Sequence, residues 1–542
     1  MKNQTVSKKK SAVVYASLGI ILMLTMFLRL YGIEWGLPTS LHPDYSYHPD
    51  EAPHLIWSQW LSQGQLIAKQ FIYGGTFYYV VLRACIYFGD SFSEAFGGFN
   101  TLANAILVAR YLQVFVALLT MLLVYECGRL LYDRKSGLVA ALVLALAPAH
   151  IIATQTVRPD TISVFLVALI ALMAAKLLRS KSPDHRKLLV YSGIAIGAAA
   201  AFRLPLVGFG LMPVIAYVVA RQRTSGDLFR KSLFSWDALW LILAVVLAYV
   251  VLSPHTLMYL RAFIMGIAVT VGYETTVDPD AVDRGPIFFQ YAWRLLHQAL
   301  GYPGYFLALA GMFHALVRRR VEDMIVLAGI GLYFIMLASV SLTLVRYTLP
   351  ILPLLALLSG VAVIRIFEQV RHDYARVFTY FVAGFLLAWT LAADLAFLHV
   401  TASKNARVQA SEWITQNIPQ GKSTLLVKQY DGDDFINPIM SPRHKNFAVL
   451  LADGGDSQKI FSEMKIDYVV LHELFYADME RLGSRHPRKE AWDFYEAMTG
   501  AGLKLVQEIR VPVQFLGIDF SGSFEAADFL VVNPAIRIYQ VP

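Results

Sequence analysis

The sequence predicts a polytopic α-helical membrane protein with about 11 transmembrane helices, followed by a small C-terminal α/β domain. Of its 542 residues, 57% are hydrophobic and only 16% are charged, whereas soluble proteins usually carry about 25% charged residues. The apolar residues also form uncharged runs of nearly bilayer length, such as 137–153 and 238–252. This clustering excludes the soluble globular class.

Hydropathy places the predicted helices in order along the first 400 residues. The first run follows a Lys-rich start and is too long for a cleaved signal peptide, so we expect a retained signal anchor. The predicted spans lie near 11–33, 106–126, 137–153, 161–178, 188–202, 205–220, 238–254, 301–317, 324–342, 348–366 and 377–399.

Two more apolar segments lie between the first two spans. Residues 52–61 have the pattern of an amphipathic helix lying in the membrane interface, with Trp57 and Trp60 at headgroup depth. Residues 71–89 fit an interfacial helix, a re-entrant segment or a true span equally well. We therefore expect interfacial helices in the first outer loop.

Basic residues predict the orientation. Twenty Lys and Arg residues lie in loops on the N-terminal side of the membrane, against eight on the opposite side. This bias predicts a cytoplasmic N-terminus in a plasma (inner) membrane and a periplasmic or extracellular C-terminus. Because these cations lie between hydrophobic runs, the net charge of +8 indicates membrane orientation, and no nucleic acid partner is expected.

The C-terminal part has a different pattern. Short strand-like runs at 423–430, 467–472, 503–509 and 536–541 alternate with polar helical stretches. The predicted domains are residues 1–399, a membrane domain with long outer loops 34–105 and 255–300, and residues 400–542, a soluble non-cytoplasmic α/β domain. The two cysteines, Cys85 and Cys127, lie in or beside apolar segments, which excludes a disulfide-stapled ectodomain and a Cys-based zinc site.

The first outer loop carries the strongest chemical signal. Asp50 and Glu51 are adjacent carboxylates flanked by His48 and His54. One interpretation is that the acids cap the following helix. The other is a general base, because neighbouring carboxylates at a low-dielectric boundary disfavour joint ionisation. The same acids, together with Asp160, are candidate ligands of a divalent cation such as Mg²⁺ or Mn²⁺, although no HExxH spacing supports a metal.

A second signal comes from residues at the outer ends of spans. Asp160 follows Arg158 and Pro159 in a short outer loop, where it either begins a helix or places a second carboxylate facing the first. The arginines at outer ends are Arg29, Arg158, Arg203 and Arg346. Snorkelling to headgroups explains one or two of them, but several together suggest a bound anion, and guanidinium suits phosphate. Arg346 with Tyr347 is the favoured phosphate-binding pair, and His255 is a weaker candidate.

Taken together, five short motifs carry a family resemblance. They are Arg29-Leu30-Tyr31-Gly32, Pro49-Asp50-Glu51, Arg158-Pro159-Asp160, Arg346-Tyr347-Thr348-Leu349-Pro350 and Trp413-Ile414-Thr415-Gln416-Asn417-Ile418-Pro419. In this order and spacing, the chain resembles the GT-C fold membrane glycosyltransferases that use polyprenyl-phosphate sugars, of the protein-mannosyltransferase and aminoarabinose-transferase type (glycosyltransferase family 39-like).

The resemblance implies an inverting transfer of a hexose or pentose from a polyprenyl-phosphate donor to a hydroxyl or amine of a glycan, lipid or protein acceptor. It implies that Asp50 is the catalytic carboxylate with Glu51 beside it, that Arg346 binds the lipid phosphate, and that Asp160 shapes the substrate pocket. A cofactor is either not required or is a divalent cation. The alternatives are a transporter or flippase of polyprenyl lipids or solutes, and a non-catalytic envelope-assembly protein; the ionisable residues lie at span ends rather than mid-membrane, which disfavours transport.

Overall fold

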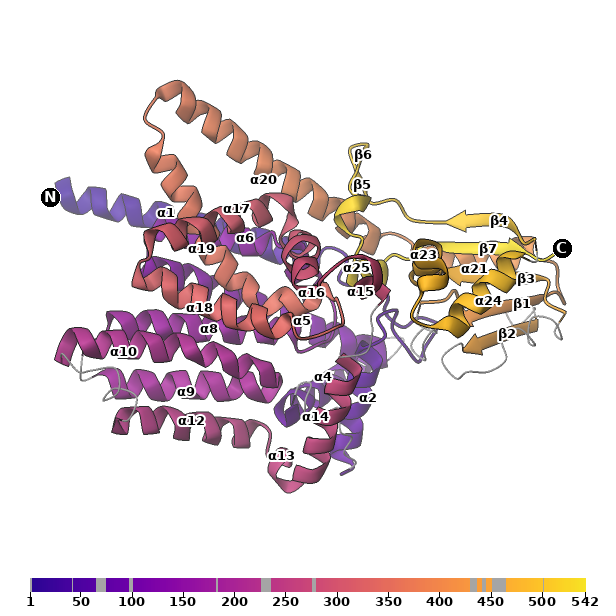
Figure 1. Ribbon diagram of the computed structural model, residues 1–542, viewed down its shortest axis with the longest axis horizontal. Helices are drawn as coiled ribbons and strands as arrows, with labels where there is room; N and C mark the ends of the chain where they lie inside the picture. Colours follow the sequence, from indigo (N-terminus) through magenta and orange to yellow (C-terminus); the bar gives the residue numbers. More distant parts are fainter. Residues whose placement is uncertain are drawn as a thin grey trace.

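The computed structural model describes residues 2–40, 42–64, 75–96, 101–181, 184–225, 235–274, 279–428, 436–440, 445–450, 465–500 and 502–542. Long helices lie side by side in one part of the molecule, and strands β1, β2, β3, β4 and β7 are gathered at the end that holds the C-terminus (Figure 1). The predicted fold class is confirmed: a multi-pass helical membrane protein with a small strand-containing C-terminal region.

Each of the eleven predicted spans coincides with a helix in the described part of the chain. Seven helices are long and apolar enough to cross a membrane, and an eighth span results if α6 and α7, which meet at a 63° bend, are taken together. Pro148, the first residue of α7, accounts for this break because proline cannot continue a preceding helix. The helices are α1 (Lys2–Leu30), α5 (Thr101–Leu131), α6 (Arg134–Ala145), α7 (Pro148–Thr154), α8 (Asp160–Arg179), α9 (His185–Phe202), η2 (Leu204–Gly210), α10 (Leu211–Ser225), α12 (Trp236–Leu252), α17 (Leu296–Arg318), α18 (Val321–Leu337), η4 (Val345–Ile351), α19 (Leu352–Gln369) and α20 (Asp373–Ala402).

Small residues let these helices approach closely. A Cβ added at Gly197 of α9 would lie 2.3 Å from the carbonyl oxygen of Val245 in α12, and one at Gly193 would lie 2.6 Å from that of Leu241. Close backbone contact at glycine is typical of helices packed in a membrane, where dispersion rather than the hydrophobic effect holds neighbours together.

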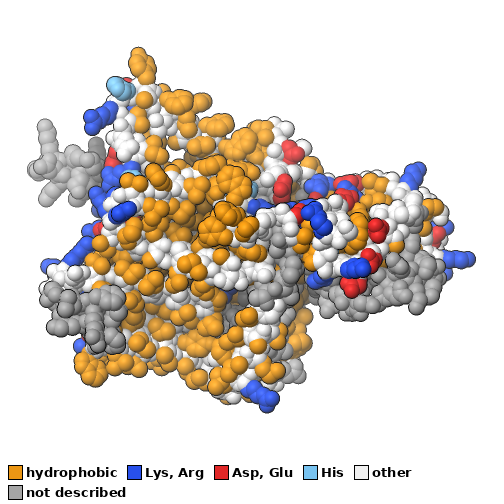
Figure 2. Space-filling view, viewed as in Figure 1, with side chains coloured by type: hydrophobic (Ala, Val, Ile, Leu, Met, Phe, Trp, Pro, Cys, Tyr) orange, Lys and Arg blue, Asp and Glu red, His pale blue; other side chains and the backbone are white. Residues whose placement is uncertain are grey.

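The outward faces of the helices are apolar. Figure 2 shows hydrophobic side chains covering most of the visible helical surface, while charged side chains gather near its two ends. Large side chains such as Trp236, Val251 and Phe381 are mostly exposed. A surface of this kind requires lipid around it.

The two long loops predicted at 34–105 and 255–300 also contain helices. They are α2 (Glu51–Ser62), α4 (Gly75–Phe96), α13 (His255–Met258), α14 (Leu260–Glu274), α15 (Pro279–Asp283), α16 (Ile287–Phe289) and the π-helix η3 (Gln290–Leu295). The helix predicted at 52–61 is α2. Of the ambiguous segment 71–89, residues 71–74 lie outside the described residues and the rest belongs to α4, which packs closely on α5: a Cβ at Gly89 would lie 2.7 Å from the Ala105 nitrogen.

The C-terminal region contains a mixed five-stranded sheet with the order β2-β1-β3-β7-β4. Strand β1 (Ser423–Lys428) is parallel to β2 (Lys445–Leu450) and β3 (Tyr468–His472), while β7 (Ile536–Gln540) is antiparallel to β3 and β4 (Lys504–Ile509). The four predicted strands coincide with β1, β3, β4 and β7. The other elements are α21 (Ala406–Asn417), α23 (Glu473–Leu482), η7 (Gly483–Arg485), α24 (Lys489–Gly500), a hairpin of β5 (Gln514–Phe515) and β6 (Ile518–Asp519), η8 (Ser521–Ser523) and α25 (Ala527–Leu530).

Residues 520–529 of this region pack against the ends of α17 and α20 that lie nearest to it. Phe524 and Phe529 lie with their ring centroids 4.6 and 5.4 Å from that of Phe397 in α20. The Ala526 N–H donates to Gln298 Oε1 of α17 at 2.8 Å. Helix α25 is thereby fixed beside η4.

Candidate active site

The carboxylate of Asp50 lies where three distant parts of the chain meet. Asp50 is the residue before α2, and its Oδ2 atom lies 3.4 Å from Arg346 Nη1 and 3.6 Å from Arg158 Nη1. Its side chain is 36% exposed, whereas that of Arg158 is 4% exposed. Asp50 is thus an accessible carboxylate backed by two guanidinium groups.

Asp160 forms the inner side of the same cluster. Its side chain is fully buried and pairs with Arg203 at 2.9 Å and with Arg158 at 3.3 Å. The ring of Tyr347 lies under the guanidinium of Arg203, 4.9 Å from ring centroid to Cζ, and 5.8 Å from that of Arg346. Three predicted arginines, two predicted acids and Tyr347 are therefore brought together.

Asp528, which sequence reasoning missed, is the third carboxylate of the cluster. It belongs to α25 of the C-terminal region, and its Oδ2 accepts the backbone N–H of Arg346 at 3.2 Å. Its Oδ1 lies 3.6 Å from Arg346 Nη1 and 3.9 Å from Arg158 Nη1. No local pattern marks this residue, because only the docking of α25 brings it to the membrane part.

Glu51 points away from Asp50 into the protein. Its carboxylate, which is fully buried, receives hydrogen bonds from Arg110 Nε at 2.9 Å and Nη2 at 2.7 Å, and from the Val157 N–H at 2.8 Å. Arg110 also donates to the carbonyl of Trp35 at 2.7 Å. The pair thus ties α2, α5 and two outer loops together. Arg110 lies inside the predicted span 106–126. Because an arginine within a membrane span is costly unless it is paired, its presence there indicates a buried acidic partner.

The predicted histidines occupy two places. His48 accepts the backbone N–H of Asp50 at 3.2 Å, and His54 makes a 3.2 Å hydrogen bond with the hydroxyl of Tyr79. His255 lies instead at the contact of α13 with α4, where its Nδ1 is 2.9 Å from the hydroxyl of Thr76. His48 and His54 therefore adjoin Asp50, and His255 is held at a different contact.

Charges in the cluster set the protonation states. Burial raises the pKa of the Asp50 carboxyl group, but the charges of Arg346, His48 and Arg158 outweigh burial and hold that pKa well below its usual range. Burial, with the charge of Arg158, lowers the pKa of His48 well below its usual value and that of His54 to about 4. At neutral pH the cluster therefore combines ionised Asp50 with two neutral imidazoles.

The candidate metal ligands do not form a metal site. Within the described ranges, no group of three or more His, Cys, Asp or Glu residues is arranged to hold an ion. The carboxylates of Asp50, Glu51 and Asp160 instead face arginines, and such cations compete directly with a bound metal.

An apolar groove begins next to the cluster. It runs between α4, α5, α8, α9 and α12, and its volume is about 330 Å³. Val157, the neighbour of Arg158, lines it together with Phe77, Leu112, Phe165 and Phe202. Its lining is the kind that accommodates a hydrocarbon chain.

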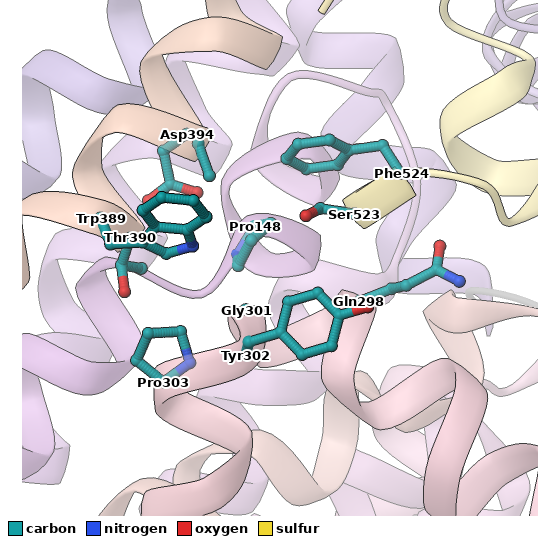
Figure 3. Close-up of a pocket in the computed structure, with 11 residues that line it drawn as sticks. Pro148, Gln298, Gly301, Tyr302, Pro303, Trp389, Thr390, Asp394, Ser523 and Phe524 are labelled. Carbon is teal, nitrogen blue, oxygen red and sulfur yellow. The ribbon is translucent and has the colours of Figure 1, made fainter. Parts of the chain in front are cut away.

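A second cavity lies between α17, α20 and the C-terminal region. Figure 3 shows Asp394 and Trp389 of α20 on one side of it and Phe524 on the other. Asp394 is 2% exposed and has no hydrogen-bond partner among the described residues. The predicted outer-end residue Arg29 belongs to this neighbourhood rather than to the Asp50 cluster, and bonds to His150 at 2.7 Å.

Comparison with known proteins bears on this arrangement. The family model of dolichyl-phosphate-mannose-protein mannosyltransferase matches residues 97–257, and no curated protein matches the chain. The solved structure of the oligosaccharyltransferase AglB from Archaeoglobus fulgidus, in complex with an inhibitory peptide and a dolichol-phosphate, aligns with a TM-score of 0.53 at 15% identity, covering 92% of this chain and 73% of that one. The chain has the GT-C fold.

Two other solved structures are similar. The Archaeoglobus fulgidus oligosaccharyltransferase in complex with Zn and sulfate aligns with a TM-score of 0.52 at 16% identity, over 88% of this chain and 70% of that one. ArnT from Cupriavidus metallidurans in the apo state aligns with a TM-score of 0.49 at 13% identity, over 98% of both chains. The two oligosaccharyltransferase structures confirm, at the level of the fold, the resemblance predicted from the sequence.

Proposed function

We propose that the chain is an inverting glycosyltransferase that moves a sugar from a polyprenyl-phosphate donor to an acceptor hydroxyl or amine. Asp50 is the general base, and Arg346, with Arg158, is the clamp for the donor phosphate. The observation that carries this proposal is the convergence of an accessible carboxylate with two arginines that lie 108 and 296 positions away in the chain. Val157, the neighbour of Arg158, lines an apolar groove.

The chemistry needs only these groups. A phosphate ester is a good leaving group, so no general acid is required. Asp50 takes the proton of the attacking acceptor, and a positioned base accelerates a reaction by about 10²–10⁴-fold. The arginines offset the negative charge that grows on the departing phosphate, which is electrostatic stabilisation of the transition state.

Donor binding also activates the base. In the described structure the charge of Arg346 is directed at Asp50 and depresses its pKa. A phosphate bound to Arg346 neutralises that charge, so the basicity of Asp50 increases when the donor is in place. Proton transfer is thereby coupled to the presence of the sugar donor.

The groove explains the preference for a lipid carrier. Its apolar wall starts at Val157, one residue from Arg158. A phosphate at Arg158 and Arg346 places the first isoprene units in this groove while the sugar faces Asp50. AglB, solved with a dolichol-phosphate, is a relative by fold that binds a ligand of this chemistry.

The remaining assignments follow from the basic loops. We propose a plasma (inner) membrane location, with a cytoplasmic N-terminus, the catalytic cluster at the outer face, and residues 400–542 as a periplasmic or extracellular domain beyond the membrane domain 1–399. The acceptor is a glycan, lipid or protein.

Asp160 and Arg203 hold Arg158 in place, Tyr347 supports Arg346, and Glu51 anchors the loop through Arg110.

Mass spectrometry of lipid-linked sugars and envelope glycans tests the proposal. Cells lacking the gene should accumulate a polyprenyl-phosphate sugar and lose one glycan modification, and the intact gene should reverse both changes. Asp50→Asn should fail to reverse them, whereas Asp44→Asn, an exposed carboxylate of the same loop, should succeed. If Asp50→Asn complements as well as Asp44→Asn does, Asp50 is not the general base. If loss of the gene leaves the pool of lipid-linked sugar unchanged, the proposed function is refuted.

A further inference from the structure

The Nη1 atoms of Arg158 and Arg346 are each shared between the carboxylates of Asp50 and Asp528, while the Nε atom of Arg158 also pairs with Asp160 at 3.3 Å. Their Nη1 atoms lie 3.6 and 3.4 Å from Asp50, and 3.9 and 3.6 Å from Asp528. Charge-assisted hydrogen bonds are usually about 2.7–2.9 Å long, as in the 2.9 Å pair of Arg203 with Asp160. The two guanidinium groups are therefore held between the carboxylates rather than against either one.

The position of Asp528 is fixed by packing. Its side chain is 11% exposed and accepts the backbone N–H of Arg346 at 3.2 Å. Its helix is anchored by the hydrogen bond from Ala526 to Gln298 and by the contact of Phe529 with Phe397. The C-terminal region thus delivers a negative charge to a set place opposite Asp50.

We propose that Asp528 is a positioning residue of the active site, supplied by the C-terminal region to hold Arg346 and Arg158 off Asp50. This inference rests on the proposed function. The attraction of Asp528 for both guanidinium groups balances that of Asp50, so the Asp50 carboxylate stays open to the acceptor and retains its capacity to take a proton.

Removing this charge has opposite effects on two properties. Without it, Arg346 moves closer to Asp50, and Arg158 does so as far as its pair with Asp160 allows. Asp50 then becomes a weaker base, so transfer slows. The phosphate site meanwhile gains one unit of positive charge, so a lipid phosphate binds at least as tightly as before. A residue with a purely structural role would weaken binding and transfer together.

The matched variants are Asp528→Asn and Glu525→Gln. The first keeps an oxygen that accepts the Arg346 N–H but removes the charge; the second makes the same change at an exposed position three residues away. One measurement is the affinity of the purified full chain for sugar-free polyprenyl phosphate. The other is the rate at which cells clear the lipid-linked sugar that accumulates without the gene.

Asp528→Asn should slow clearance by about tenfold or more, the range in which a general base acts, while its affinity for polyprenyl phosphate stays equal or rises by up to about tenfold. Glu525→Gln should match the wild type in both. Parallel loss of affinity and clearance, or clearance equal to that of Glu525→Gln, would overturn the inference.

Two further outcomes are informative. Asp528→Asn could lower the unfolding temperature more than Glu525→Gln does, and Asp528→Glu, which restores the charge, is then the test. Clearance of the lipid-linked sugar should recover in Asp528→Glu. Clearance no faster than that of Asp528→Asn would overturn the inference. If the wild type itself clears no lipid-linked sugar, the proposed function is refuted together with this role. If the wild type clears the lipid-linked sugar, and Asp528→Asn clears it as fast as Glu525→Gln does, only the role of Asp528 is refuted.

Discussion

Arg346 Nη1 lies 3.4 Å from Asp50 Oδ2, although the two residues are 296 positions apart in the chain. The distance is longer than a tight charge-assisted hydrogen bond, and the Asp50 side chain remains 36% exposed. In the proposed reaction this loosely paired carboxylate receives the acceptor, and its partner Arg346 receives the donor phosphate.

Replacement of Asp50 tests the base directly. Asp50→Asn should reduce sugar transfer by about 10²–10⁴-fold, because the amide cannot accept the acceptor's proton. The affinity for sugar-free polyprenyl phosphate should not fall, since the variant frees Arg346 from one carboxylate. Transfer is followed by clearance of the lipid-linked sugar, and affinity by a binding assay on purified protein. A residual rate within about threefold of wild type would assign proton transfer to another group.

Replacement of Arg346 tests the clamp. Arg346→Ala should lower the affinity for polyprenyl phosphate by at least about tenfold, because a charged hydrogen bond to phosphate contributes about 1.5–3 kcal/mol. Arg346→Lys should recover only part of it, since an ammonium group lacks the bidentate geometry of guanidinium. The exposed Arg371→Ala is the control, and equal affinities for the two alanine variants would contradict the clamp.

Glu51 and Arg110 should matter for stability. Glu51→Gln or Arg110→Met breaks a fully buried ion pair, which costs about 3–5 kcal/mol and lowers the unfolding temperature in detergent. The control is Glu126→Gln, which breaks a partly exposed pair with Arg129 on the same helix, where about 0–1 kcal/mol is expected. Loss of transfer in Glu51→Gln with an unchanged unfolding temperature would instead favour a direct catalytic role for Glu51.

His54 should make the fold sensitive to mild acid. Its pKa is about 4 in the folded chain and about 6.5 when unfolded, so the unfolded state binds more protons as pH falls below 6.5. Stability is therefore lost between pH 6.5 and 4, by about 2 kcal/mol at pH 5. His54→Gln should flatten the dependence of unfolding temperature on pH in this window. The exposed His372→Gln should leave it unchanged, and a His54→Gln curve parallel to wild type would contradict the assignment.

Gly197 should tolerate no side chain. A Cβ there would lie 2.3 Å from the Val245 carbonyl oxygen, while one at Gly331 would meet nothing within 4 Å. Gly197→Ala should separate α9 from α12 and destabilise the protein by about 1–3 kcal/mol. Gly331→Ala should be neutral or slightly stabilising because alanine favours helix. Thermal unfolding of the two variants in detergent makes the comparison, and equal transitions would show that α9 and α12 do not depend on this contact.

The linear sequence determined the features that depend on local composition. Apolar runs of nearly bilayer length predicted eleven spans, each of which overlaps one or two of the described helices, because lipid requires each backbone segment to satisfy its own hydrogen bonds. Short strand-like runs separated by polar helical stretches likewise predicted β1, β3, β4 and β7. Strand β2 at one edge of the sheet was not predicted, whereas β4 at the other edge was.

Only the tertiary structure decided which charged residues meet. Asp50 and Glu51 are neighbours in sequence, yet one faces Arg346 and the other is buried against Arg110, because adjacent residues at the start of a helix point in different directions. Asp528 joins Arg346 across 182 positions solely because aromatic contacts dock α25 on the membrane helices. Hydropathy is a property of each segment alone, whereas pairing between charges depends on where packing places distant segments, and no local pattern records that.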